Sequence, residues 1–336
     1  MTDISSLTYE QLGEFINSLG EPKFRVKQVF EWISRGVLSF DEMTNLSKTF
    51  RQKLAEQATM ATLSVKKKLV DTDGTVKYLF ELSDGNLIET VVMSYKHGKS
   101  VCISSQAGCR MGCKFCASTL LGKNRDLTAG EMLLQVAYAN KENHVSNVVV
   151  MGVGEPLDNY DNLIIFLKNL KDENGLNISH RHVSVSTCGI VPKIDELADE
   201  DLQITLSISL HAPDDETRDI LMPVNKTYNI KTLISACDRY FKKTGRRISY
   251  EYTLIKGVND TVIHAEKLSV LLGGKNCHIN LIPVNYVKER GLLPSDKSAA
   301  DRFLKTLIKN GLNATMRRTL GGEINASCGQ LRNSES

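Results

Sequence analysis

The stretch CRMGCKFC, residues 109–116, places three cysteines in a C-x3-C-x2-C array. A closed zinc site uses four ligands, whereas a 4Fe-4S cluster held by three thiolates keeps one iron open for a small chelating ligand. The spacing therefore predicts an iron-sulfur cluster on a loop, with Cys109, Cys113 and Cys116 as ligands and Phe115 as a shield against solvent. Two alternatives stay open: a zinc site with a distant fourth ligand, and buried structural thiols.

From residue 101 onward the chain alternates between β-rich and helical runs. The β-rich runs are VCISS (101–105), SNVVVMG (146–152), HVSVST (182–187), QITLSIS (203–209), ISYEYTLI (248–255) and HINLIP (278–283), and each precedes a run with helical spacing of apolar residues. Six such units predict a parallel sheet, closed or partly closed into a barrel. We expect an α/β fold in which residues 101–336 form a partial (β/α)6 barrel.

The chain before this barrel divides into two parts. Residues 1–62, with LTYEQLGEFINSL and FRVKQVFEWISRG, have apolar residues at helical spacing and predict a small α-helical domain. Residues 63–100 predict a short β extension, because two β-prone runs flank Asp73 and Gly74, a hairpin signal, and NLIETVVM (86–93) is a third strand.

The composition limits the class of protein. The 336 residues are 41% hydrophobic, enough for a full core, and 42 basic against 39 acidic residues give a net charge of +3, so bulk charge does not indicate a nucleic-acid binder. The amino terminus lacks the pattern of a secretory signal, and no apolar run reaches the roughly 18 residues of a membrane span. We expect a cytoplasmic protein, away from membranes, whose eight cysteines are thiols.

Polar residues follow the predicted strands at the ends where a barrel has its active face. They are Glu155 in MGVGEP, Ser186 in VSTCG, Ser209 and His211 in SISLH, and Asn285 in IPVN. Any one of them is explained by turn formation or capping. Five in the same phase favour a binding site at the carboxyl ends of the strands.

Several motifs resemble those of a known family. CRMGCKFC resembles the radical S-adenosylmethionine (SAM) signature, and MGVGEP (151–156) resembles the glycine-rich stretch of that superfamily. CISSQAGC (102–109), SLHAP (209–213), INLIPVN (279–285) and RRTLGGEINASCGQL (317–331) resemble the RlmN/Cfr family of radical SAM RNA adenine methyltransferases, over nearly the whole chain. Val153 and Ser327 replace the usual methionine and alanine, and neither change removes a functional group.

This resemblance implies the cofactors and the site residues. The cofactors are a 4Fe-4S cluster on the three cysteines and SAM, two molecules per turnover. The methyl-carrying cysteine falls on Cys328, the second catalytic cysteine on Cys102 and a carboxylate base on Glu89. The implied SAM contacts are Gly154, Glu155, Ser186, Ser209, Leu210, His211 and Asn285.

The chemistry implied by the resemblance explains the two extra cysteines. Adenine C2 is electrophilic, so it cannot attack the SAM methyl group itself. In the family's route the Cys328 thiolate first accepts a methyl group from SAM. A 5'-deoxyadenosyl radical from a second SAM then removes hydrogen from that methyl group, and the carbon radical adds to the ring. Cys102 attacks Cys328 to form a disulfide bond and release the product, while Glu89 or Cys102 removes the ring proton.

The resemblance also implies partners. They are 23S rRNA and tRNA as substrates, and an electron donor such as flavodoxin or ferredoxin. The protein is expected to be a monomer, and its amino-terminal domain is expected to bind RNA. Basic runs at 66–68, 179–182, 246–247 and 317–318 are candidate phosphate contacts, although charge runs are more often solvated faces.

Other interpretations stay open at this stage. Pro156 resembles the C2-methylating branch of the family, whereas the Cfr type, which methylates C8, commonly has alanine there. A non-catalytic Fe-S RNA-binding module and a radical SAM activase of a protein partner are alternatives of other classes. Cys188, Cys237 and Cys277 are expected to be core thiols.

Overall fold

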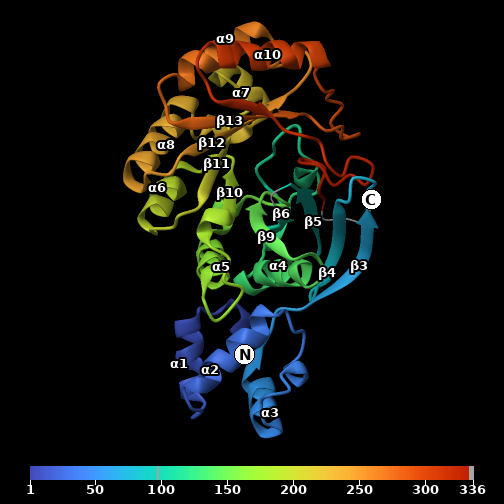
Figure 1. Cartoon of the computed structure of the whole chain (residues 1–336), viewed down its shortest axis with the longest axis vertical. Coiled ribbons are helices and arrows are strands. Elements are labelled where there is room, and N and C mark those ends of the chain that lie inside the picture. Colours follow the sequence, from blue (N-terminus) through green and yellow to red (C-terminus); the bar gives the residue numbers. More distant parts are fainter. Residues whose placement is uncertain (97, 333–336) are drawn as a thin grey trace.

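One large sheet runs through the centre of the molecule (Figure 1). The computed structural model describes residues 1–96 and 98–332. The sheet has ten strands in the order β14-β13-β12-β11-β10-β9-β6-β5-β4-β3. Its parallel strands are β6 (Gly98–Ile103), β9 (Val145–Val150), β10 (Val183–Thr187), β11 (Thr205–Ser209), β12 (Ile248–Leu254), β13 (Cys277–Pro283) and β14 (Ala314–Met316). The six predicted strands are confirmed, and β14 is a short addition that the sequence pattern did not indicate.

Helices connect the parallel strands and cover the outer face of the sheet (Figure 1). They are α4 (Ala129–Asn143), α5 (Tyr160–Lys171), α6 (Val191–Asp199), α7 (Asp215–Leu221), α8 (Ile230–Thr244), α9 (Val262–Leu272) and α10 (Lys297–Lys309). β14 and β3 stand at opposite ends of the strand order, so the sheet is an open barrel. The predicted α/β fold with a partial (β/α)6 barrel is therefore confirmed.

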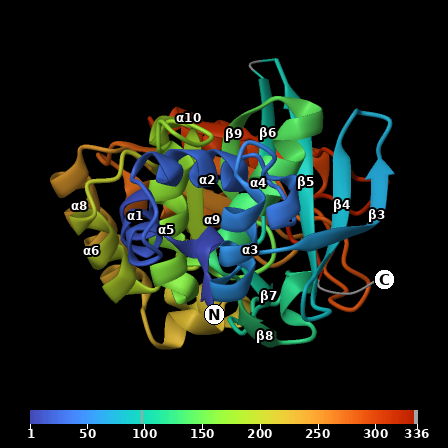
Figure 2. The same ribbon diagram turned by 90° about the horizontal axis from the view of Figure 1, so that it is seen from below.

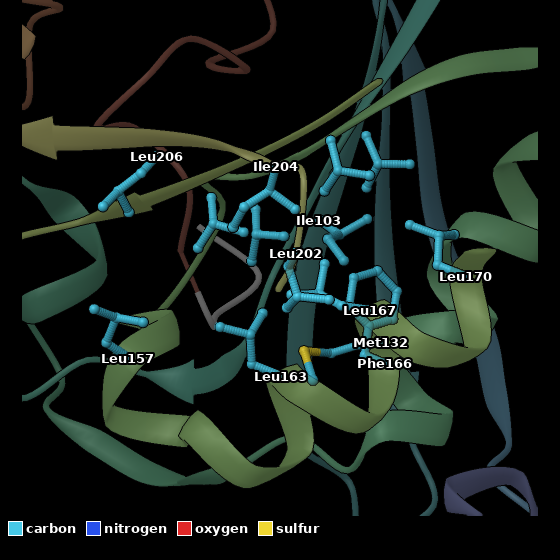
Figure 3. Packing of buried hydrophobic residues seen from close by; sticks show 14 of the residues in the cluster. Ile103, Met132, Leu157, Leu163, Phe166, Leu167, Leu170, Leu202, Ile204 and Leu206 are labelled. Atoms are coloured by element: carbon cyan, nitrogen blue, oxygen red, sulfur yellow. The ribbon is translucent and has the colours of Figure 1, made fainter. Parts of the chain in front are cut away.

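The core lies between these helices and the sheet. Helix α5 turns one apolar stripe toward the sheet, at positions i, i+3, i+4 and i+7. The stripe consists of Leu163, Phe166, Leu167 and Leu170, which are all fully buried. Figure 3 shows them in the same cluster as Ile103 of β6. Because each such side chain contributes about 1.5–3 kcal/mol on burial, the stripe is the main attachment of α5 to the barrel.

The predicted β extension forms the antiparallel end of the same sheet. β3 (Leu63–Val70) and β4 (Val76–Leu82) form the predicted hairpin, and β5 (Leu87–Tyr95) is the third strand. β5 pairs antiparallel with β6, so the extension continues the barrel without a break. A separate two-stranded sheet, β7 (Gln106–Gly108) with β8 (Lys123–Asp126), encloses the loop that carries the three cysteines.

The amino-terminal region is mainly helical, as predicted, with α1 (Tyr9–Ser18), α2 (Phe24–Ser34) and α3 (Lys48–Gln57) below the barrel (Figures 1 and 2). It also contains a short parallel pair, β1 (Thr2–Asp3) with β2 (Ala58–Thr59). This region packs closely against Gly130 of α4, where a Cβ would lie 2.5 Å from Ser5 Cβ. The N–H of Gly130 also donates to Ser6 Oγ at 3.0 Å. In the described residues, no helix is both long and apolar enough to cross a bilayer.

The register of the parallel strands aligns polar residues in rows across the sheet. One row contains Ser186, Ser207, Ser249 and His278, and the next contains Ser209, Glu251, Asn280 and Thr315. Residues in register on parallel strands point to the same face. The apolar residues between them lie under the helices, so the polar rows face the inside of the barrel, and three of their members, Ser186, Ser209 and Glu251, line the pocket described below.

Candidate active site

A pocket opens at the carboxyl ends of the parallel strands, and we call it the main pocket. Its walls include most of the residues that the sequence singled out. They are Cys109, Cys113, Phe115, Cys116, Gly154, Glu155, Ser186, Ser209, His211, Asn285 and Cys328. The fold therefore brings together the cysteine array, the strand-end residues and the tail cysteine, which are separated by up to 219 positions in the chain, from 109 to 328.

The three cysteines of the array line one wall of the main pocket. The N–H of Cys109 donates to the Gly122 carbonyl at 2.9 Å, and the guanidinium of Arg290 donates to the Cys116 carbonyl at 3.1 and 3.2 Å. Burial raises the pKa of Cys109 to about 12 and also raises the pKa of Cys113 and Cys116. Cys109 is buried and Cys113 and Cys116 are partly buried, and three such thiols at one wall fit an iron-sulfur cluster, which would bind them as thiolates.

The cysteine array is not arranged around a single metal ion. Among residues 1–96 and 98–332, no three His, Cys, Asp or Glu side chains are grouped to hold one ion. The ligands of a 4Fe-4S cluster bind different irons, so their sulfurs need not surround a single point. The donor set of three thiols therefore fits the cluster without requiring a mononuclear arrangement.

The glycine-rich turn after β9 is shaped by close packing. Gly154 has a φ of 109°, and a Cβ there would lie 2.6 Å from Gln106 Cβ. Only glycine fits this backbone and this spacing. Next to it, Glu155 is buried, and its carboxylate accepts the N–H of Cys188 at 2.7 Å and that of Leu157 at 3.0 Å. Burial raises the pKa of Glu155. The turn thus places the backbone of Gly154 and the hydrogen-bonded carboxylate of Glu155 in the wall of the main pocket.

His211 is a neutral, fixed imidazole in the pocket wall. Its Nδ1 accepts the N–H of Thr253 at 2.9 Å, and its ring packs edge-on against Phe115 with centroids 4.7 Å apart. Burial lowers the pKa of His211 to about 3. The remaining ring nitrogen, Nε2, therefore carries the hydrogen and is a donor. His211 also has a φ of 56°, a strained backbone for a residue with a side chain.

Arg218 supports the loops around the pocket and was missed at the sequence level. It is fully buried, and its guanidinium donates to the carbonyls of Cys188 at 2.7 Å, Ser209 at 3.1 Å and Leu210 at 3.1 Å. The predicted contact Leu210 is itself buried and is not among the lining residues. An isolated arginine in α7 has no local signal, because its partners come from the end of β11 and from the segments that follow β10 and β11.

The carboxyl-terminal tail, residues 317–332, lies against the cysteine loop. Asn285 Nδ2 donates to the Cys328 carbonyl at 2.9 Å, the N–H of Ala117 donates to the Gly329 carbonyl at 2.8 Å, and Ser118 Oγ donates to the Leu331 carbonyl at 2.7 Å. Cys328 lines both the main pocket and a second, smaller pocket, which we call the side pocket. The tail thus places Cys328 at the boundary between the two.

Cys102 lines the side pocket together with Cys328. Burial raises the pKa of Cys102 to about 12, so its sulfur is a thiol at neutral pH. All eight cysteines are free, so the predicted disulfide bond between Cys102 and Cys328 is not formed in this structure. The two thiols nevertheless face the same small space.

Arg317 and Glu251 also line the main pocket, and neither was assigned to the site from the sequence. Proximity to Cys328, and secondarily to Glu251, raises the pKa of Arg317 against the effect of burial. Glu251 is buried and its carboxylate accepts from Asn280 Nδ2 at 2.7 Å. The alternation of polar residues along ISYEYTLI is a signal that Glu251 faces the inside of the barrel. The sequence indicates Arg317 only as a candidate phosphate contact.

Glu89 is not among the described residues that line the main pocket or the side pocket. It is buried on β5; its Oε1 lies 2.8 Å from Lys77 Nζ, and its Oε2 accepts the N–H of Arg332 at 2.6 Å. Burial raises the pKa of Glu89, against the effects of Lys77 and of the Arg332 amide. Its carboxylate is thus engaged with the tail.

The remaining predicted residues fall in different surroundings. In the run at 66–68, Lys66 is paired with Glu81 at 3.0 Å and Lys68 with Glu142 at 2.7 Å. The runs at 179–182 and 246–247 precede β10 and β12, at the end of the barrel opposite the pocket. The three expected core thiols, Cys188, Cys237 and Cys277, are buried, and Cys188 additionally lines the main pocket.

Comparisons with known proteins agree with this arrangement. Residues 103–267 match the model of the radical SAM superfamily, and residues 2–60 match that of the ribosomal RNA large subunit methyltransferase N-terminal domain. A crystal structure of a radical SAM methyltransferase from Sphaerobacter thermophilus is 42% identical, with a TM-score of 0.96 over 99% of this chain and 100% of that one. The open barrel and its three-cysteine loop thus define the class, the radical SAM proteins.

Curated relatives define the family within this class. A protein of Lachnospira eligens, named a probable dual-specificity RNA methyltransferase RlmN, is 56% identical over 99% of this chain and 96% of the relative. A protein of the same name from Clostridium novyi is 52% identical over 99% of this chain and 98% of the relative. The chain belongs to the RlmN family of radical SAM RNA methyltransferases.

Proposed function

We propose that this cytoplasmic enzyme methylates C2 of an adenine in 23S rRNA and of an adenine in tRNA, through an S-methylcysteine at Cys328. The observation that carries this proposal is the place of Cys328, which lines both the pocket with the cysteine array and the pocket with Cys102. A conventional methyltransferase has no use for a thiol in such a position. We further propose a monomer that receives electrons from flavodoxin or ferredoxin.

The residues proposed to hold the cofactors line the main pocket, except Leu210, which is buried between two lining residues. Cys109, Cys113 and Cys116 would hold a 4Fe-4S cluster, and SAM would contact Gly154, Glu155, Ser186, Ser209, Leu210, His211 and Asn285. When bound, the cluster and SAM supply the methyl group and the carbon radical chemistry. Neutral His211 offers a hydrogen-bond donor, and the backbone of Gly154 allows close approach.

The two remaining cysteines are proposed to act in sequence. Cys328 gives up its thiol proton and accepts the methyl group. That carbon would lose one hydrogen atom to the SAM-derived 5'-deoxyadenosyl radical and bond to adenine C2, and the ring would then lose its C2 hydrogen as a proton and one electron, which the cofactor would take up. Cys102, once deprotonated, attacks the Cys328 sulfur; the S–S bond forms as the S–C bond breaks, and the electron pair passes to the carbon, which takes a proton. Glu89 or Cys102 is the proposed base for the ring proton. An external thiol then reduces the disulfide.

Substitution of each cysteine tests this order. Cys328→Ala should keep its cluster and lose RNA methylation, because that thiol lies outside the array. Cys102→Ala should accumulate a covalent protein-RNA adduct at Cys328 that resists denaturing electrophoresis and disappears on nuclease treatment. Normal turnover by either variant would refute the two-cysteine route. Mass mapping of the RNA product decides the ring position, and 8-methyladenine as the main product would contradict the C2 assignment.

A further inference from the structure

The loop that carries Cys328 depends on contacts with distant parts of the chain. Within residues 1–96 and 98–332, the last strand ends at Met316 and no helix follows it. The tail therefore has no hydrogen-bond ladder of its own to fix its position. Several of its backbone groups instead bond to the cysteine loop, to the loop after β13 and to the β extension.

One buried ion pair contacts the tail on both sides of Cys328. Lys77 on β4 and Glu89 on β5 are 9% and 6% exposed in their side chains, with Nζ and Oε1 2.8 Å apart. Lys77 Nζ also donates to the carbonyl of Asn325 at 3.2 Å, and Glu89 Oε2 accepts the N–H of Arg332 at 2.6 Å. Asn325 lies three residues before Cys328 and Arg332 four residues after it.

The polarity of the pair matches the groups that it binds. Lysine is a donor and meets a carbonyl, while the carboxylate is an acceptor and meets an N–H. Both bonds are charge-assisted, and such bonds are stronger than neutral ones. The backbone also bends at the first anchor, since Asn325 has a φ of 51°. Beyond the second anchor, the Arg332 side chain donates to Glu289 at 2.8 and 3.1 Å, which ties the same end to the loop after β13.

This arrangement bears on the role of Glu89. Each of its oxygens already has a partner, and Glu89 is not among the residues that line the main or the side pocket. A base must come within hydrogen-bond reach of the proton that it removes. We propose that Lys77 and Glu89 form a clip that holds the Cys328 loop over the pocket, and that Glu89 is a positioning residue rather than the base. This inference rests on the proposed role of Cys328.

Hydrogen exchange of the protein without RNA tests the clip directly. In Lys77→Met, and in the double variant Lys77→Met/Glu89→Leu that leaves no unpaired buried charge, amides of residues 325–332 should exchange at least about tenfold faster, because a charge-assisted bond shifts local opening by about that factor. Lys275→Met, which breaks an ion pair with Asp238 remote from the tail, is the matched control and should leave this exchange unchanged. Wild-type exchange of the tail in both clip variants would overturn the proposal.

A charge swap separates the clip from simple ion-pair stability. Lys77→Glu/Glu89→Lys restores the ion pair, but it places a carboxylate against the Asn325 carbonyl and an ammonium against the Arg332 N–H. The swap should therefore fail to restore slow exchange of the tail. Recovery of wild-type exchange and activity in the swapped protein would show that only the charge pair matters and would refute the clip.

Glu89→Gln separates positioning from proton removal. The amide oxygen of Gln still accepts from Arg332, so we expect a smaller loss of RNA methylation activity than in Glu89→Leu. Methylation of Cys328 should be slower than in the wild type, and no protein-RNA adduct should accumulate. Wild-type methylation of Cys328 with a trapped adduct would instead identify Glu89 as the base. Failure of the proposed function would be recognised separately, as normal RNA methylation by Cys328→Ala with the exchange results unaffected.

Discussion

Replacement of Arg218 by Met tests how strongly one buried side chain supports the site. Met keeps a long, unbranched stem but removes the guanidinium, which donates to three carbonyls and, at 3.0 Å, to Asn225 Oδ1. Four buried acceptors would lose a charged donor. If each of these four hydrogen bonds contributes about 1.5 kcal/mol, their removal lowers the free energy of unfolding by about 6 kcal/mol. The variant no longer buries a charge, which offsets about 2 kcal/mol. The expected loss of unfolding free energy is therefore about 4 kcal/mol.

Thermal unfolding and SAM binding measure the two consequences of this change. For a chain of this size 1 kcal/mol corresponds to about 2 °C, so the melting temperature should fall by about 8 °C. Because two of these carbonyls, those of Ser209 and Leu210, belong to the segment that carries Ser209 and His211, SAM affinity of the cluster-loaded variant should fall about tenfold. Arg239→Met, whose side chain only pairs with Asp195 at the surface, is the control and should melt as wild type does. An Arg218→Met protein that melts within about 1 °C of wild type and binds SAM normally would refute this reasoning.

Three further predictions follow from the site and the core. Cys113→Ala should lose or degrade the cluster, seen as loss of iron and visible absorbance after anaerobic reconstitution, and full iron content would contradict its role as a ligand. Gly154→Ala should weaken SAM binding in an equilibrium assay, since its Cβ would meet Gln106 at 2.6 Å with φ at 109°, and unchanged affinity would count against the predicted contact. His180 is buried, its Nε2 donates to the Leu167 carbonyl at 2.8 Å, and burial lowers its pKa. Because His180 takes up a proton near pH 6.5 in the unfolded chain but not in the folded one, the free energy of unfolding should decrease below about pH 6.5. This decrease should be smaller in His180→Gln when melting temperatures are compared from pH 8 to 5.

Several features of this protein follow from short stretches of sequence. The hairpin at Asp73 and Gly74 and the apolar stripe of α5 depend on residues a few positions apart, so local patterns predict them. The C-x3-C-x2-C spacing brings three thiols to one wall because a single loop carries them. The alternation of strands and helices predicts the barrel, since helical crossovers return each strand parallel to the one before. The role of each site residue stays a prediction.

Other features depend on segments that are far apart in the chain. Alternating polar residues in β10 to β13 indicate that one face is polar, but only the curvature of the sheet decides that this face is the lumen and not the solvent-exposed surface. Strand β14 has three residues, too few for a period to emerge, and it exists because β13 offers it an edge. Glu89 meets Arg332 across 243 positions, and Arg218 meets Cys188 across 30. The sequence by itself determined the elements and their chemistry; the tertiary structure decided which buried charges meet, because such contacts arise only when the whole sheet brings distant strands and the tail together.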